Sequence, residues 1–440
     1  MALAMMNQNK FMYEVVKMNI LIIGSGGREH TLAWKVAQSP KCSKLYAMPG
    51  NPGIAELAEC VKGISINDNE AVVKFAKEKQ IDLVVIGPEA PLVNGLADDL
   101  KNAGIKAFGP SKAAAQLEGS KIFAKQIMKK YNIPTATYEI FDDADKARAY
   151  IESENKPLVI KADGLAAGKG VIIAMNKEGA LNAVDEIMEQ KSFGDAGSRI
   201  VIEEFMDGEE ASLLAFTDGK TIISMIPSQD HKRVDDGDEG LNTGGMGAYA
   251  PAPVMTDEII KLAEERILKP IISAMSSEGH IYQGCLYAGL MIVNGEPKVV
   301  EFNARFGDPE TQVVLPLLKS DLVDIMLACV DGTLNAQKVE WSDEYAVCVV
   351  LTSGGYPKSY GKGYEIDGIN KAKFLGNLII HAGTKEVNGK IVTDGGRVLG
   401  VVATSSGIKS AVEKAYKGVE VIHFENMHFR HDIAHHALKG

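Results

Sequence analysis

The segment VIKADGLAAGKGV, residues 159–171, combines lysines and small residues in a pattern that could bind phosphate groups. Lys161 ends an apolar run typical of a strand, and the loop after it holds Gly164, Gly168, Lys169 and Gly170. Small residues let backbone N–H groups approach a triphosphate, and the ammonium groups offset its charge. The spacing of these glycines and lysines differs from the GxxxxGK[ST] pattern of a P-loop. An exposed hairpin with incidental lysines is the alternative.

A second segment, IVIEEFMDGEEAS, places carboxylates on both sides of a turn. Glu203 and Glu210 are seven positions apart, so one could meet an adenine amino group and the other the ribose hydroxyls. The backbone of Phe205 and Met206 would lie between them. Taken alone, a solvated acidic turn is the more common interpretation of such a cluster.

A third segment, KVVEFNARFGDPETQ, carries oxygen ligands at strand spacing. Glu301 and Asn303 are two apart, so their side chains share one face of the expected strand. Hard oxygen ligands suit Mg²⁺ held jointly with phosphates. Arg305 continues this face and could neutralise a transferring phosphoryl group. The alternative is a polar edge strand on which Arg305, Asp308 and Glu310 pair with one another.

The opening segment, NILIIGSGGREHTLAWKVAQ, predicts a strand, a glycine turn and a helix that could bind an anion. The dinucleotide fingerprint needs a third glycine where this chain has Glu29, and an acidic residue about 20 positions later. The second strand instead ends before Asn51. Gly26 and Gly27 therefore predict an anion site without a dinucleotide half.

The elements that must position these residues follow from the apolar pattern. Short apolar runs alternate with helical patterns from residue 19 to about 120, which predicts parallel strands with crossover helices. The glycine-rich loop lies in a small α+β unit, and the strand-rich stretch after it predicts an antiparallel sheet. A mixed C-terminal domain follows from about residue 341. The fold class is thus α/β and α+β, multidomain.

Composition narrows the function classes. The chain has 440 residues, with 47 Lys plus Arg against 58 Asp plus Glu and a net charge of −11, which argues against a nucleic-acid partner. Its five cysteines have no CxxC spacing, which favours reduced thiols in a cytoplasmic protein. No apolar stretch approaches the ~18 residues of a membrane span. Residues 1–17 lack a signal-peptide pattern and are expected to be an extension.

The motifs GSGGREH, GPEAPL, QLEGSK, KADGLAAGKGV, SQDHKR, NTGGMGAY and EFNARFGDPETQ occur here in this order. Together they resemble the phosphoribosylamine–glycine ligase family, also called glycinamide ribonucleotide synthetases, of the ATP-grasp superfamily. The resemblance runs from residue 18 to about 434. It implies a two-step reaction of purine biosynthesis, in which ATP phosphorylates glycine and 5-phosphoribosylamine attacks the glycyl phosphate. The implied partners are small molecules only, and we expect a monomer.

The resemblance also implies roles for individual positions. ATP would be held by Lys121, Lys161, Gly164, Gly168, Lys169, Gly170, Glu203, Phe205, Met206 and Glu210. Mg²⁺, or Mn²⁺, would be held by Glu301 and Asn303. Phosphoribosylamine would be held by Gly26, Gly27, Glu29, Asn51 and Pro88. The glycine and acyl-phosphate site would be lined by the catalytic residues Asp230, Arg305 and Asp308.

The expected domains are a phosphoribosylamine-binding α/β domain over 18–119, an ATP-grasp domain over 120–335 and a C-terminal domain over 336–440. A mobile lid is expected at about 136–207. Two features depart from the resemblance. The stretch LYAGLMI lacks the second metal carboxylate that many ATP-grasp enzymes carry before the Glu301 position, and Ala434 replaces an expected glycine. His30, His231, His435 and His436 lack metal-binding spacing in the sequence.

Three other functions stay open at this point. Another ATP-grasp ligase or carboxylase would share the nucleotide site and differ in the acceptor site. A nicotinamide-dependent oxidoreductase is suggested by the first glycine turn, although Glu29 and the missing ribose acid count against it. A non-catalytic module would bind ATP without releasing phosphate.

Overall fold

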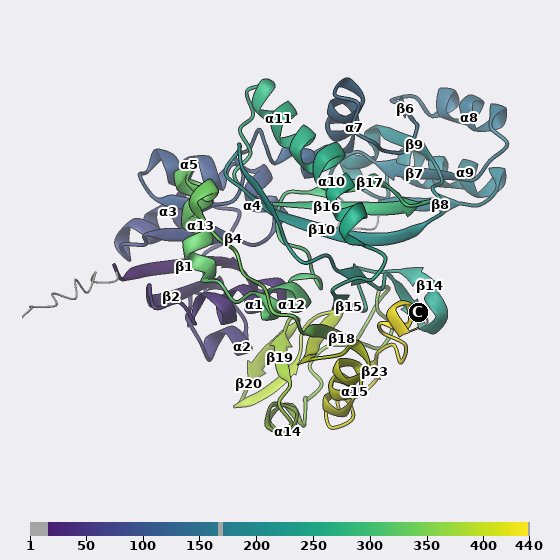
Figure 1. Ribbon diagram of the computed structural model, residues 1–440. Helices are drawn as coiled ribbons and strands as arrows, with labels where there is room; N and C mark the ends of the chain where they lie inside the picture. Colours follow the sequence, from purple (N-terminus) through teal and green to yellow (C-terminus); the bar gives the residue numbers. More distant parts are fainter. Residues whose placement is uncertain (1–15, 166–169, 439–440) are drawn as a thin grey trace, which may run out of the picture.

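The computed structural model describes residues 16–165 and 170–438. The elements form an N-terminal sheet, a lid sheet, a central sheet and a C-terminal sheet. In Figure 1 the N-terminal sheet lies on the left, the lid strands at the upper right and the C-terminal strands below. Among the described helices, none combines the length and the apolar character that crossing a bilayer requires.

The N-terminal sheet is parallel throughout, as the alternating pattern predicts. Its order is β3-β2-β1-β4-β5. The strands are β1 (Met18–Gly24), β2 (Cys42–Pro49), β3 (Glu59–Cys60), β4 (Leu83–Ile86) and β5 (Lys106–Phe108). Its helices are α1 (Gly27–Val36), α2 (Pro52–Ala55), α3 (Asn69–Glu78), α4 (Glu89–Val93) and α5 (Leu96–Asn102). The order reverses beside β1, so the carboxyl ends of β1, β2 and β4 form the edge where such sheets bind ligands.

The lid sheet is antiparallel, in the order β6-β9-β7-β8. Its strands are β6 (Tyr138–Phe141), β7 (Leu158–Ala162), β8 (Val171–Ala174) and β9 (Ile200–Glu204). The helices α8 (Ala144–Ser153) and α9 (Lys177–Val184) share a hydrophobic core with these strands. Strands β7 and β8, which precede and follow the glycine-rich segment in the chain, pair in antiparallel fashion.

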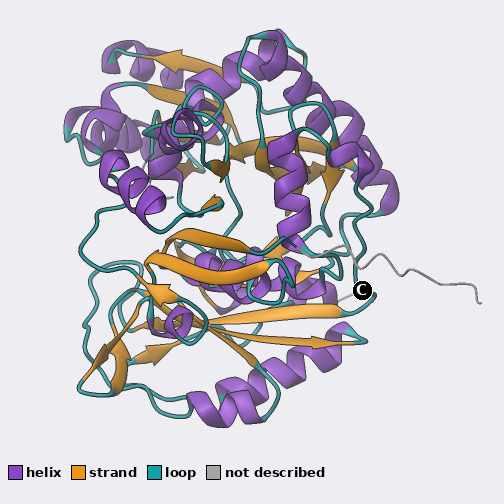
Figure 2. Ribbon diagram, turned by 90° about the vertical axis from the view of Figure 1, so that its left-hand side faces the viewer, coloured by secondary structure: helices purple, strands orange, loops and turns teal. Residues whose placement is uncertain are grey.

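The central sheet is antiparallel, as predicted, in the order β11-β10-β16-β17. Its strands are β10 (Glu209–Thr217), β11 (Ile222–Ser224), β16 (Gly284–Val293) and β17 (Glu296–Asn303). The helices that share a core with it are α7 (Lys121–Lys130), α10 (Asp257–Ala263) and α11 (Lys269–Ser277). The Ser120 hydroxyl accepts the Phe123 N–H and so fixes the start of α7. Figure 2 shows the whole molecule turned by 90°, with helices and strands in different colours.

The C-terminal sheet has the order β12-β15-β18-β22-β19, and β23 pairs with β18. Its strands are β12 (Gln229–Asp230), β15 (Gly247–Ala250), β18 (Tyr345–Ser353), β19 (Leu378–His381), β22 (Arg397–Ser405) and β23 (Met427–His428). Two hairpins, β13 (Arg233–Asp235) with β14 (Glu239–Asn242) and β20 (Thr384–Val387) with β21 (Lys390–Thr393), lie beside it. The helices here are α14 (Ile369–Phe374), α15 (Ile408–Val419) and α16 (His435–Leu438).

The strands β12 and β15 come from residues inside the range expected for the ATP-grasp domain, yet they pair within the C-terminal sheet. Two short connecting segments complete the contact between the domains. These are α6 (Gln116–Gly119) before α7, and α12 (Thr311–Val314) with α13 (Leu322–Asp331) after β17. Residues of β1, α12, α13 and β18 share one hydrophobic core. The domains are therefore joined through a common interior.

Candidate active site

Glu203 is the centre of a buried ion-pair triad. Its two carboxylate oxygens each lie 3.0 Å from an ammonium group, one from Lys161 and the other from Lys125. Antiparallel pairing sets Val159 opposite Glu203, so Lys161, two positions further on, lies on the same face. Burial lowers the pKa of Lys125 to about 8, although Glu203 partly offsets this. The Glu203 carboxylate thus fastens α7 to the lid sheet, beyond the ligand contact expected of it.

The Lys161 ammonium also donates to the carbonyl oxygen of Val300 at 3.0 Å, so it joins the lid to β17. Lys121, at the first turn of α7, joins that helix to the segment after β7, since its ammonium donates to the Gly164 carbonyl at 3.1 Å. Gly164 has a φ of 120°, which disfavours any side chain there. The predicted Gly168 and Lys169 lie outside the described residues, whereas Gly170 accepts the Ala162 N–H at 2.8 Å.

Glu210 and Glu301 face a common space across one strand. In the register of the central sheet, Glu210 on β10 is opposite Met291 of β16, and Glu301 on β17 is opposite Gly289. The Glu210 side chain is exposed to solvent. Desolvation by neighbouring protein atoms, together with the negative charges of Asp230 and Glu301, raises the pKa of Glu210. A carboxylate that is accessible but enclosed is placed to meet a ligand.

Three lysines keep the Glu301 carboxylate ionised. Burial favours its protonated form, but the positive charges of Lys232, Lys161 and Lys121 outweigh this and lower the pKa of Glu301. The Asn303 amide lies 3.4 Å from Glu301, on the same face, as the spacing predicts. An ionised carboxylate beside an amide oxygen offers the hard donors that Mg²⁺ prefers. These residues therefore fit a metal shared with phosphates.

Arg305 lies next to this pair, and its guanidinium donates to the Asn303 side-chain oxygen at 3.1 Å. It also lies 2.9 Å from Glu118 and 3.5 Å from Glu89. Burial opposes its charge, but these two carboxylates prevail and raise the pKa of Arg305. The expected alternative, mutual pairing with Asp308 and Glu310, is not the arrangement found among the described residues.

Asp308 is where the three domains meet. One carboxylate oxygen accepts the Arg28 backbone N–H at 3.2 Å, and the other accepts the Gln312 side-chain amide at 2.7 Å. Arg397 of β22 lies 3.3 Å from the same carboxylate. Burial opposes ionisation, yet the charges of Arg397 and Arg28 lower the pKa of Asp308. The carboxylate is therefore an anion that links all three domains.

Asp230 and Lys232 form a further, half-buried pair, with 2.6 Å between carboxylate and ammonium. Burial opposes the charge on Lys232, and the negative charge of Asp230 is the main factor that nonetheless raises its pKa well above the usual value. Gly245 packs between this pair and Pro309, because a Cβ there would lie 3.5 Å from an Asp230 carboxylate oxygen and 2.4 Å from Pro309. The loop around Gly245 thus closes tightly on the segment that carries Asp308.

At the first glycine turn the side chain of Glu29 fills the space. Its carboxylate accepts the Gly26 N–H at 2.6 Å and pairs with Arg28 at 2.5 Å. A Cβ at Gly24 or Gly87 would come within 2.5 Å of Glu29 atoms. One of the backbone donors expected to cradle a phosphate is therefore already used. This contact is one half of a capping box, since Gly26 has no side chain to supply the other half. This packing explains why the dinucleotide pattern stops here.

Asn51 and Pro88 border the same edge of the sheet. The Asn51 amide nitrogen donates to the carbonyls of Ser25 and His381, each at 2.8 Å, and its oxygen accepts the Ile54 N–H at 2.9 Å. Its side chain thus couples the N-terminal and C-terminal domains. Pro88 is the residue that precedes the first turn of α4.

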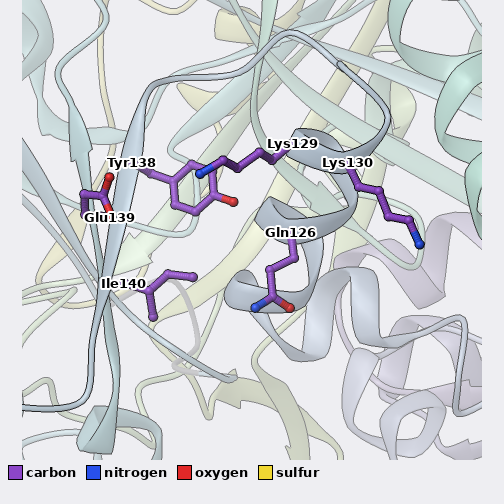
Figure 3. A pocket seen from close by; sticks show the side chains of 6 residues that line it. All are labelled: Gln126, Lys129, Lys130, Tyr138, Glu139 and Ile140. Carbon is purple, nitrogen blue, oxygen red and sulfur yellow. The ribbon is translucent and has the colours of Figure 1, made fainter.

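The pocket between α7 and β6 is separate from these groups. It has a volume of about 380 Å³ and is lined by Gln126, Lys129, Lys130, Tyr138, Glu139 and Ile140 (Figure 3). The Lys129 ammonium lies 5.6 Å from the centre of the Tyr138 ring. No residue assigned to nucleotide, metal or substrate lines this pocket, so it is not the candidate site.

Sequence reasoning missed several residues that shape the site. Three of them lie inside motifs that the sequence already singled out: Lys232 in SQDHKR, Arg28 in GSGGREH and Glu118 in QLEGSK. Those motifs could therefore have indicated these residues. Lys125 lies on the helix that begins at Lys121, but only the fold reveals its pairing with Glu203. Arg397 has no local signal, since its partner Asp308 is 89 positions earlier.

Comparisons with known proteins show what this chain is similar to. Three family models match in order, namely the phosphoribosylglycinamide synthetase N domain over residues 18–118, its ATP-grasp (A) domain over 119–311 and its C domain over 346–436. A phosphoribosylamine–glycine ligase of Halalkalibacterium halodurans is 50% identical, covering 96% of this chain and 97% of its own length.

Solved structures show the same fold. A phosphoribosylamine–glycine ligase of Thermotoga maritima superposes with a TM-score of 0.83 at 36% identity, covering 94% of this chain and 100% of its own. A biotin carboxylase domain of Hydrogenobacter thermophilus, in complex with MgADP and bicarbonate, has a TM-score of 0.70 at 15% identity. It covers 94% of this chain and 91% of its own. At that identity the second likeness concerns the fold alone.

Proposed function

The chain belongs to the phosphoribosylglycinamide synthetase family, and we propose that its reaction, the ATP-dependent ligation of glycine to 5-phosphoribosylamine, runs through glycyl phosphate. A carboxylate resists nucleophiles because attack adds charge to an anion. Transfer of the γ-phosphoryl group to a glycine carboxylate oxygen releases ADP and creates a good leaving group. The amine then attacks the acyl carbon, phosphate leaves, and the amine loses a proton.

The observation that carries this proposal is the convergence of Lys161, Glu210 and Glu301. These charged groups interact electrostatically, since the charge of Glu301 raises the pKa of Glu210 and the charge of Lys161 lowers it. They come from the lid sheet and from two strands of the central sheet, which supports a triphosphate held between two lobes. Mg²⁺, when bound at Glu301 and Asn303, would withdraw charge from the phosphate oxygens.

The chain's own residues would supply the rest. Lys161 and Lys121 would offset charge on the phosphates, with the hairpin loop covering them. Arg305, held as a cation by Glu118 and Glu89, would stabilise charge on the transferring group. The other predicted ATP contacts (Gly164, Gly168, Lys169, Gly170, Glu203, Phe205, Met206) keep their proposed place around the nucleotide.

The acceptor side is proposed at the junction of the three domains. Asp230 and Asp308 would border the glycine, and the edge formed by Gly26, Gly27, Glu29, Asn51 and Pro88 would border phosphoribosylamine. Glu29 and Asn51 would act there mainly through the backbone groups that they hold. A monomeric state, a cytoplasmic location and the domain limits given above remain predictions.

An isotope experiment tests the intermediate. With glycine labelled by ¹⁸O in its carboxylate, we expect one labelled oxygen in each inorganic phosphate released. Phosphate without label would contradict a glycyl phosphate, even if ligation proceeds. Phosphate release that persists without glycine, or with a different amine acceptor, would instead point to another ATP-grasp activity. ATP binding without any release would indicate a non-catalytic module.

A further inference from the structure

Three side-chain donors converge where the C-terminal helix meets the β13–β14 hairpin. They are Asp238, from the turn between the two strands, and the adjacent His435 and His436 of α16. Figure 1 shows the C-terminus beside β14. The histidines lie nearly 200 positions from Asp238, so sequence spacing gave no sign of a metal site here.

The distances fit a tetrahedral metal. One oxygen of Asp238 lies 3.3 Å from Nε2 of His435 and 3.0 Å from Nε2 of His436. All three donor atoms lie within 4.8 Å of one another. Zinc bonds of about 2.0–2.1 Å to nitrogen and oxygen place neighbouring ligand atoms about 3.4 Å apart. The donors are thus near their required separation.

The neighbours of His435 orient it for binding. Its Nδ1 lies 3.0 Å from the Asp432 carbonyl oxygen, which can only accept, so Nδ1 carries the proton. In the neutral ring, Nε2 then turns a lone pair toward the Asp238 oxygen. Two acceptors this close repel each other unless a metal ion lies between them or Nε2 also carries a proton. A carbonyl behind a metal-binding histidine is also the usual outer-shell partner.

Asp238 is held from its other side. The guanidinium of the fully buried Arg430 donates to the opposite carboxylate oxygen at 2.8 Å, which leaves the inner oxygen for the histidines. His231 belongs to the same group of side chains, and its Nδ1 lies 3.6 Å from the other Asp238 oxygen. Its Nε2 accepts the Ala434 N–H at 2.9 Å, so in the neutral ring the proton is on Nδ1.

We propose that Asp238, His435 and His436 bind a late first-row divalent cation, Zn²⁺ foremost, with a fourth position open to water. Imidazole and carboxylate are the donor types that suit such ions. The bound ion would fasten α16 to the β13–β14 hairpin, which begins directly after Lys232 of the active site. This site is independent of the metal proposed at Glu301 and Asn303.

The test is equilibrium dialysis of the full-length protein against Zn²⁺ alone, without nucleotide. We expect one equivalent bound, and we expect His435→Gln and His436→Gln each to weaken binding at least about tenfold, as even outer-shell changes do. His423→Gln removes an exposed histidine outside the cluster and should change nothing. Circular dichroism of the metal-free variants establishes that they are folded.

Two further measurements locate the ion. Substituted Co²⁺ should give the visible absorption of a four-coordinate site with nitrogen and oxygen ligands, without a thiolate band. Glu301→Gln should leave Zn²⁺ binding unchanged. Absence of binding, binding that both histidine variants retain, or binding that Glu301→Gln removes would overturn the proposal. Absence of binding would mean that these side chains form hydrogen bonds and ion pairs only.

Discussion

The guanidinium of Arg397 donates to the backbone carbonyl of Asp308 at 2.8 Å and lies 3.3 Å from the carboxylate of the same residue. It also donates to the Gly244 carbonyl at 2.7 Å. One C-terminal side chain therefore holds both the Asp308 segment and the loop that packs on Asp230. The C-terminal domain thus helps to shape the proposed acceptor site.

Replacing Arg397 by Lys should impair the acceptor side. All three contacts run to Nη1 of Arg397. A lysine side chain is one bond shorter, so its ammonium would fall short of that position, and misplacement by about 1 Å can cost about 100-fold in rate. We expect kcat/KM for phosphoribosylamine to fall by about that factor, while the KM for ATP changes little. Steady-state kinetics with each substrate varied would check this. Equal changes in both parameters would contradict it.

Replacing Glu301 by Ala should abolish turnover at millimolar Mg²⁺ and leave the fold intact. Loss of a residue that stabilises transition-state charge typically costs about 10²–10³ in kcat. The matched control is Glu296→Gln at the exposed start of the same strand, where the glutamate pairs with Arg266. Normal activity of the Glu301 variant in the phosphate-release assay would remove the metal assignment.

Replacing Arg305 by Lys should reduce the rate more than the affinity for ATP. The guanidinium reaches Glu118, Asn303 and the Phe306 carbonyl at 2.9–3.2 Å, a fork that a point charge cannot reproduce. We expect kcat to fall about 10–100-fold if the group acts in the transition state. Calorimetry of ATP binding provides the comparison. Equal losses would indicate a ground-state role.

Acidification should lower the stability of the folded protein through two buried histidines, His30 and His381. Burial, with charge from His381 and Lys373, lowers the pKa of His30 from 6.5 to about 3, and burial lowers the pKa of His381 to about 4. Below pH 6.5 the unfolded chain binds protons that the folded one does not. Stability is therefore complete above pH 6.5 and falls toward the folded pKa values, by about 1.4 kcal/mol per pH unit and histidine.

Urea unfolding between pH 7 and 5 measures this slope. The His30→Gln variant lacks one of the two titrations, so its stability should depend less steeply on pH. His423→Gln is the control, since its ring is exposed. Identical slopes in wild type and His30→Gln would show that these buried rings do not govern the acid response.

Ala434 should tolerate glycine but not valine. It is fully buried and has a φ of 70°, which costs an L-residue about 1–2 kcal/mol. In Ala434→Gly, relief of this strain offsets the lost methyl burial of about 0.8 kcal/mol and the added chain entropy of about 0.5–1 kcal/mol. We expect a change within about 1 kcal/mol.

Ala434→Val combines a β-branched residue at positive φ with overpacking, which typically costs about 1–3 kcal/mol. Urea midpoints of both variants test the argument. A valine variant as stable as wild type would contradict the left-handed conformation at this position.

The amino-acid sequence by itself determined the local geometry and, through its motifs, the family. The apolar run of β1 predicted a strand before the glycine turn, and the two-residue spacing placed Glu301 and Asn303 on one face. Such patterns are reliable because backbone periodicity alone decides which neighbouring side chains share a face. The parallel N-terminal sheet and the antiparallel central sheet followed from the same reasoning.

Only the tertiary structure decided which distant groups pair. It showed Glu203 between Lys125 and Lys161, Glu29 folded into its own glycine turn, and Arg397 on Asp308. It also brought His435 and His436 to Asp238. Periodicity carries no information across tens or hundreds of residues, because those contacts arise when separate sheets pack into one interior and buried charges must find partners.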